Sequence, residues 1–113
     1  MNNGLSLEKI VKILTDGYAI KILAATTQDT KSAIQLSQEL DVPIAACYRR
    51  LHLLEKAGLI HSQERVTPKG KRMKYYMSKI KRAHIEIEDN TLIVELLFLN
   101  GNVKKYTGKI VAG

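Results

Sequence analysis

The sequence contains very little cysteine, and this scarcity limits the chemistry open to the chain. Cys47 is the single cysteine among 113 residues, so neither an internal disulfide nor a four-thiolate zinc site can form. The histidines His52, His61 and His84 are far apart and lack the HxxxH spacing of zinc ligands. We therefore expect no bound metal, and we interpret Cys47 as a small, buried apolar residue.

Long apolar runs are also missing. The longest covers residues 96–99 and directly follows Glu95, whereas a membrane-spanning helix needs about 20 apolar residues. Residues 1–4 lack the basic start and apolar stretch of a secretory signal. Hydrophobic residues make up 45% of the chain, which is normal for one domain that buries a core. These features predict a soluble cytoplasmic protein with no membrane partner.

Acidic residues are absent from residues 65–82, although this stretch carries eight basic residues. The formal net charge of the chain is +7, and the remaining residues are nearly neutral, so this stretch supplies the whole excess. Such a concentration favours a polyanionic partner. A solvated surface without a partner is the alternative, and the position of the stretch in the fold decides between them. The eight residues are Arg65, Lys69, Lys71, Arg72, Lys74, Lys79, Lys81 and Arg82.

The first half of the chain shows helical spacing in short successive segments. Apolar residues recur with helical period over residues 7–15, and Ser6 can cap that helix. Asp16 can cap the next helix, which is apolar over most of its surface and should be buried. Ser32 and Gln35 then have the spacing of a capping box, which predicts a short helix ending near residue 40.

A further helix is predicted to begin at Pro43, because a missing N–H costs nothing in the first turn. Cys47, Leu51 and Leu54 fall on its inner face. Gly58 follows where a left-handed C-terminal cap is needed. The two short helices on either side of the tight turn before Pro43 form a helix-turn-helix unit. The second helix of such a unit enters the major groove of DNA.

After Gly58 the apolar residues change from helical to alternating spacing. Residues 59–66 and 71–78 are predicted to be strands joined by a turn at residues 67–70. The second strand has an apolar face and a basic face, formed respectively by Met73, Tyr75 and Met77 and by Arg72, Lys74 and Tyr76. We expect the apolar face to pack on the helices, with Tyr75 inside, and the basic face to point to solvent. A basic hairpin directly after a helix-turn-helix is a wing.

Residues 36–60 resemble the winged helix-turn-helix of the ArsR-like transcriptional regulators. The strongest part is the run RxLxxLExAGLI at residues 49–60, and residues 71–76 resemble the wing strand of that superfamily. The resemblance implies a transcriptional regulator that binds double-stranded DNA, usually as a homodimer on a two-fold operator. The paired cysteines or terminal metal ligands of the family's metal sensors are not present, and no small-molecule effector is evident.

The last third of the chain departs from the usual dimeric repressor, in which a long terminal helix pairs with the first helix. Turn dipeptides at residues 89–90 and 100–101 separate strand-like segments at residues 83–88, 91–99 and 103–106. They predict a three-stranded antiparallel meander, and the turns disfavour the alternative of a helix over residues 91–99. The meander can pack on the winged helix or pair with another subunit through an edge strand. We favour dimerisation through this region together with the first helix.

The predicted fold class is therefore α+β. A winged helix-turn-helix DNA-binding domain, with three to four helices and a β-hairpin wing, covers residues 5–80. An antiparallel β-meander over residues 81–113 extends the same domain.

Candidate DNA contacts lie on the helix that begins at Pro43 and on the wing. The helix begins with small apolar residues, which can touch a thymine methyl but supply no hydrogen-bond code. Base contacts then rest on Tyr48 and above all on Arg49, for which a bidentate contact to guanine and a contact to phosphate are equal alternatives. Basic wing residues should contact phosphates. The predicted set is Ala45, Ala46, Tyr48, Arg49, Arg50, Lys69, Lys71, Arg72 and Lys74.

Two classes of function remain open at this point. The first is a sequence-specific regulator that binds double-stranded DNA, which the basic wing favours. The second is a winged-helix module that binds protein within a larger assembly, which the apolar residues 44–46 favour. An enzyme is not expected, because catalytic and nucleotide-binding motifs are missing, and no cofactor is predicted. RNA binding is weaker, because no exposed aromatic platform is evident.

Overall fold

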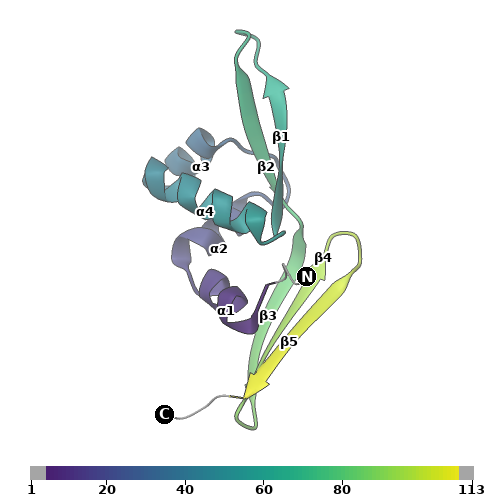
Figure 1. Ribbon diagram of the computed structural model, residues 1–113. Helices are drawn as coiled ribbons and strands as arrows, with labels where there is room; N and C mark the ends of the chain where they lie inside the picture. The colour runs from purple at the N-terminus through teal and green to yellow at the C-terminus, as the bar shows by residue number, and fades with distance from the viewer. Residues whose placement is uncertain (1–4, 110–113) are drawn as a thin grey trace.

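The computed structural model describes residues 5–109, which form four helices followed by five strands (Figure 1). The helices lie to one side of a long, two-part β structure, with one hairpin projecting beyond them and a second sheet extending the other way. The helices are α1 (Leu7–Leu14), α2 (Gly17–Ala25), α3 (Ala33–Leu40) and α4 (Ile44–Lys56). The strands are β1 (Ile60–Val66), β2 (Arg72–Ser78), β3 (Ile80–Glu88), β4 (Thr91–Phe98) and β5 (Val103–Lys109).

Helices α1 and α2 begin at the predicted side-chain caps. The Lys9 backbone N–H donates to Ser6 Oγ at 3.2 Å, and the Ala19 N–H donates to Asp16 Oδ1 at 2.9 Å. Each bond satisfies a donor that the first helical turn leaves without a partner. The two caps therefore fix where both helices begin.

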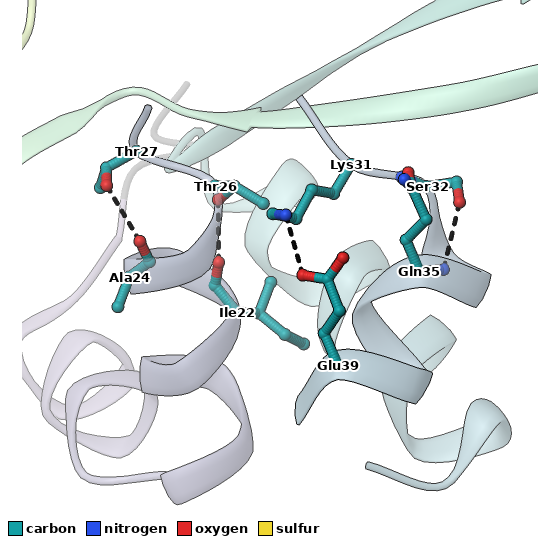
Figure 2. Close-up of polar contacts among 8 residues, drawn as sticks. All are labelled: Ile22, Ala24, Thr26, Thr27, Lys31, Ser32, Gln35 and Glu39. Atoms are coloured by element: carbon teal, nitrogen blue, oxygen red, sulfur yellow. Dashed lines mark hydrogen bonds and ion pairs between the residues drawn. The ribbon is translucent and has the colours of Figure 1, made fainter. Parts of the chain in front are cut away.

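The α3–α4 pair follows the predicted pattern closely. Ser32 and Gln35 form both bonds of the capping box, at 3.2 and 2.9 Å (Figure 2). Asp41 takes a left-handed conformation (φ 55°) and ends α3. Pro43 is the N-cap of α4 rather than a residue of its first turn, and Gly58 follows α4 with φ 79°. The chain thereby makes two short helices joined by a tight turn.

One hydrophobic core joins the helices to both sheets. Cys47, Leu51 and Leu54 form the inner face of α4 as predicted. Helix α2 is buried on one side only, with Ile20 exposed, so the prediction that most of its surface is buried is wrong. The core cluster comprises Ile10, Ile13, Leu14, Ala19, Ile22, Leu23, Ala33, Leu36, Val42, Cys47, Leu51, Leu54, Leu59, Ile60, Tyr76, Ile80, Val94, Leu96 and Phe98.

Strands β1 and β2 form an antiparallel hairpin, and the loop before α3 adds a short bridge to it. Lys31 and Tyr76 exchange backbone hydrogen bonds of 3.1 and 2.8 Å. The Lys31 ammonium also donates to Glu39 Oε1 at 2.8 Å (Figure 2). The base of the hairpin is thus tied to the start of α3, which fixes its orientation relative to α4.

The prediction for the two faces of β2 is wrong. Tyr76, assigned to the solvent side, is only 6% exposed and belongs to the core, whereas Tyr75 and its neighbours Met73 and Met77 are half-buried. The reason is the Lys31 bridge, which lays the base of β2 on the helices with Tyr76 turned inward. Alternation alone gives two faces but does not say which of them meets the helices.

Strands β3, β4 and β5 form a separate antiparallel sheet and pair in chain order. Asp89 and Asn90 both have positive φ, at 50° and 61°, which is the conformation of a tight two-residue hairpin turn. The alternative helix over residues 91–99 does not form. Strand β3 begins at Ile80, before the predicted start at residue 83, so Lys81 and Arg82 are strand residues.

Within residues 5–109, none of the helices is long and apolar enough to cross a membrane.

Candidate nucleic-acid interface

The first two turns of α4 present an exposed face. Ala45, Tyr48 and Arg49 are exposed, with Tyr48 at 52%, whereas Ala46 is half-buried and packs against the core. Arg49 takes part in none of the ion pairs found among residues 5–109. Three of the predicted helix contacts therefore face solvent, and Ala46 contributes less surface than predicted.

Arg50 points away from this face, toward α2. Its Nη2 donates to Asp16 Oδ2 at 3.0 Å, and its guanidinium lies 5.2 Å from the centre of the Tyr18 ring. The hydrogen bond from Arg50, with a second from the Ala19 N–H, holds the pKa of the Asp16 carboxyl below its usual range. Arg50 is thus engaged within the chain, so the prediction that it is a DNA contact does not fit its position.

The basic hairpin and α4 line a common groove of 310 Å³. Tyr48 contributes from α4, and Lys71, Arg72 and Lys74 contribute from the hairpin, so four predicted residues meet in one place. The same side of β2 carries Tyr76 at its base and the two cations Arg72 and Lys74 toward its tip, where helices no longer cover it. The cations of the hairpin therefore lie on the same side as α4.

The basic side chains of the hairpin differ in their surroundings. Lys69 is exposed in the turn that precedes Gly70 (φ 82°), beyond the groove. Arg72 contacts Glu64 at 3.3 Å, but both side chains are more than half exposed, so this pair is weak and easily exchanged for another anion. Arg65 stacks 4.9 Å from the Tyr75 ring centre, on the opposite face of the hairpin.

The fold divides the basic stretch that the sequence presents as continuous. Arg65 through Lys74 belong to the hairpin, whereas Lys79 lies between β2 and β3, and Lys81 and Arg82 lie in β3. Three of the eight, Lys71, Arg72 and Lys74, line the groove together with Tyr48 of α4.

Sequence reasoning missed the first turn of α3 as part of this surface. Ser32, Ala33 and Ile34 line the groove opposite the hairpin, and Ile34 is exposed. The capping box at Ser32 located this helix start correctly. The missing information was the Lys31 bridge, which brings the helix start against β2.

Cys47 lies inside the helical core. Its Sγ is 3.6 Å from the Ala33 carbonyl oxygen, and burial raises the pKa of the thiol. Across residues 5–109, no three His, Cys, Asp or Glu side chains gather closely enough to hold a metal ion.

Comparison with known protein families identifies one segment of the chain. Residues 14–63 match the family model described as a helix-turn-helix domain, from the last residue of α1 into β1. The comparison with curated proteins gave no match. Helix-turn-helix domains bind DNA and are not catalytic modules, so the match supports a DNA-binding regulator.

Proposed function

We propose that this chain is a sequence-specific regulator of transcription that binds double-stranded DNA as a winged helix-turn-helix. In this proposal α4 enters the major groove, and the hairpin β1–β2 is the wing that contacts the phosphate backbone. The observation that carries it is the shared groove, in which Tyr48 of α4 faces Lys71, Arg72 and Lys74 of the hairpin. The helix-turn-helix match over residues 14–63 supports the same function.

Arg49 is the proposed base contact of α4. It is exposed, one turn from the helix start, and a guanidinium can bind a guanine edge through two hydrogen bonds. Tyr48 and Ala45 extend the contact, the latter through a thymine methyl. Because these groups supply few hydrogen bonds, part of the sequence preference should come from DNA shape. Arg50 is not included among the proposed base contacts, because its guanidinium forms an ion pair with Asp16.

The wing supplies most of the affinity in this account. Lys69, Lys71, Arg72 and Lys74 are exposed, and each can neutralise a phosphate and release counterions. Such contacts fix the position of the protein on the duplex without selecting the sequence.

We further infer that the DNA-binding unit covers residues 5–80 and that residues 81–113 extend the same domain, of which residues 110–113 lie outside the described part. The shared core supports this, because Val94, Leu96 and Phe98 of β4 belong to the same cluster as α1. The ArsR-like resemblance, a homodimeric state, a cytoplasmic location and the absence of an effector belong to the proposal as well.

A protein-binding module is the second candidate. It is favoured by the exposed apolar side chains Ile34 and Ile44, which lie at the starts of the two helices of the helix-turn-helix. A protein partner has no general need for the cations of the hairpin, so DNA remains the better fit.

The proposal is tested by fluorescence anisotropy with a labelled duplex from the upstream region of the gene and a scrambled duplex of equal length. Each titration is repeated at several salt concentrations. A DNA-binding regulator loses affinity steeply with salt, with a logarithmic slope of about −0.9 per phosphate contact. Preference for one duplex indicates sequence-specific binding. Absence of binding to both duplexes at low salt contradicts the proposal and favours the protein-binding module.

A further inference from the structure

Strand β3 is an exposed edge of the second sheet. It pairs with β4 on one side, and within residues 5–109 no strand pairs with its other side. Residues 81–88 are all exposed, including Ile85 at 40% and Ile87 at 69%. A long edge strand with apolar side chains is a template for pairing with another chain.

Helix α1 packs mainly on the other two strands of this sheet, β4 and β5. Gly108 of β5 leaves room for Leu7 of α1, because a β-carbon on residue 108 would lie only 2.6 Å from Leu7 Cδ2. Ile85 lies opposite the buried Val94 in the β3–β4 register, so it shares the α1 side of the sheet. This side of β3 therefore carries two large apolar residues that remain exposed, Ile85 and Ile87.

The hairpin turn determines which backbone groups face the free edge. A two-residue turn at Asp89-Asn90 closes on the hydrogen-bonded pair Glu88 and Thr91. Hydrogen-bonded and non-bonded pairs then alternate along an antiparallel ladder. The backbone N–H and C=O groups of Ala83, Ile85 and Ile87 consequently point outward and are available to a new strand.

The side chains of β3 are complementary to a second, antiparallel copy of the same strand. When two copies pair about Ile85, Arg82 lies opposite Glu88 of the other copy, and His84 lies opposite Glu86. On the other face, Ile85 meets Ile85 and Ala83 meets Ile87. Within residues 82–88, every polar pair then joins a basic side chain to an acidic one, and every pair on the α1 side is apolar.

Neighbouring registers lose this match. Pairing about His84 keeps one favourable pair, Arg82 opposite Glu86, but it sets two histidines opposite each other and leaves Glu88 opposite Ile80, which is buried. Pairing about Glu86 sets two carboxylates opposite each other, which is unfavourable. Of the three registers, the one about Ile85 gives every polar residue between positions 82 and 88 a partner of opposite type.

We propose that β3 is the dimer interface and that its partner is the β3 of a second copy, paired antiparallel about Ile85. The two sheets join into one six-stranded antiparallel sheet. Ala83, Ile85 and Ile87 of both copies form an apolar strip between the two α1 helices. This inference deepens the proposed function and rests on it in one respect, since a two-fold DNA site needs a second copy of α4.

Cysteine cross-linking tests the register directly. In the proposed pairing the two Ile85 Cα atoms are about 5.5 Å apart, within the range that a disulfide spans. Each Ile87 lies opposite Ala83 of the other copy. The two Ile87 Cα atoms are therefore separated by four residues along the strand, or about 13 Å. Mild oxidation should therefore link Ile85→Cys into a covalent dimer and leave Ile87→Cys and the wild type unlinked.

Ile87→Cys is a stringent control, because Ile87 is more exposed than Ile85 and would react faster in random collisions. Linking of Ile87→Cys as readily as Ile85→Cys overturns the proposed register. Failure of Ile85→Cys to link at protein concentrations well above those used for DNA binding overturns the interface.

Exchanging the charges of Arg82 and Glu88 gives a second test, in which sedimentation equilibrium measures the affinity of dimerisation. Arg82→Glu and Glu88→Arg each create two like-charged pairs across the interface and should weaken dimerisation about tenfold. The double variant restores opposite charges and should recover most of the wild-type affinity. Arg82 and Glu88 form no ion pair among residues 5–109, so the exchange leaves the known contacts of the monomer intact. Equal dimerisation of all four proteins contradicts the pairing.

Failure of this inference is distinguishable from failure of the proposed function. A monomer that binds DNA with a steep salt dependence overturns the β3 pairing and keeps the DNA-binding function. A dimer linked through Ile85→Cys that binds no duplex keeps the pairing and overturns the DNA-binding function.

Discussion

Arg50 and Asp16 join the second helix of the helix-turn-helix to the N-cap of α2. Arg50 Nη2 donates to Asp16 Oδ2 at 3.0 Å, and Arg50 Nε lies 3.4 Å from Oδ1. Asp16 thus caps α2 with one oxygen and receives the guanidinium on both. Two adjacent arginines of α4 consequently differ in role, since Arg49 is exposed and Arg50 maintains the packing of α4 on α2.

Alanine substitution should separate these two arginines. Arg50→Ala removes the contacts to Asp16 and Tyr18 and is expected to lower the free energy of unfolding by about 1 kcal/mol. Arg49→Ala should change it by less than about 0.5 kcal/mol, because Arg49 lies on the surface. Urea denaturation measures both. Equal losses of stability would show that Arg50 has no special structural role.

The stabilisation by Asp16 should depend on pH. Its pKa in the folded chain is lowered, first by the hydrogen bond from Arg50, so the folded state favours the ionised carboxylate. The contribution is therefore complete above the unfolded pKa of about 3.9 and is lost as the pH falls through the lower folded value. The difference in unfolding free energy between wild type and Asp16→Asn should shrink below about pH 4. A constant difference from pH 7 to pH 3 is the contrary result.

The two neighbouring tyrosines of β2 should differ in their effect on stability. Tyr76→Ala leaves a cavity in the core and is expected to lower the free energy of unfolding by about 3–5 kcal/mol. Tyr75 is half-buried, so Tyr75→Ala should lower it by less than half as much. Thermal and urea unfolding of both variants provide the comparison. A larger loss for Tyr75→Ala would mean that the opposite face of β2 meets the helices.

The thiol of Cys47 should be protected in the folded protein. It is fully buried, and burial raises its pKa, so little thiolate is present or accessible at neutral pH. A thiol reagent such as DTNB should modify Cys47 at a rate that rises with urea concentration across the unfolding transition. Rapid modification in native buffer would contradict the burial of this residue.

Local sequence signals predicted the elements of this fold well. The caps at Ser6, Asp16 and Ser32 and the turn at Asp89-Asn90 act between residues close in the chain, and the structure has them all. These interactions depend on short-range geometry, which residue type and spacing largely determine.

Relationships between distant residues were not predictable in the same way. The Lys31 bridge to Tyr76 turns one face of β2 inward, and the contact with Asp16 takes Arg50 away from the exposed face of α4. Both depend on which elements meet, and alternation or helical period does not contain that information. The structure exposes Ala45, Tyr48 and Arg49 of α4, and it engages Arg50 within the chain. Contact of these α4 residues and of the hairpin cations with DNA stays a prediction.

Matched charge removal shows whether the groove between α4 and the hairpin is the DNA-binding surface. Lys71→Gln/Lys74→Gln removes two cations from the groove, and Lys105→Gln/Lys109→Gln removes two exposed cations from β5. The net charge is the same in both variants. The measurement is the slope of log affinity against log salt concentration for one duplex.

If DNA binds in the groove, the magnitude of the slope should be smaller by about 1.8 in the groove variant, and the β5 variant should keep the wild-type slope. Equal slopes for the two variants would contradict it, because DNA would then respond to overall charge and not to this surface.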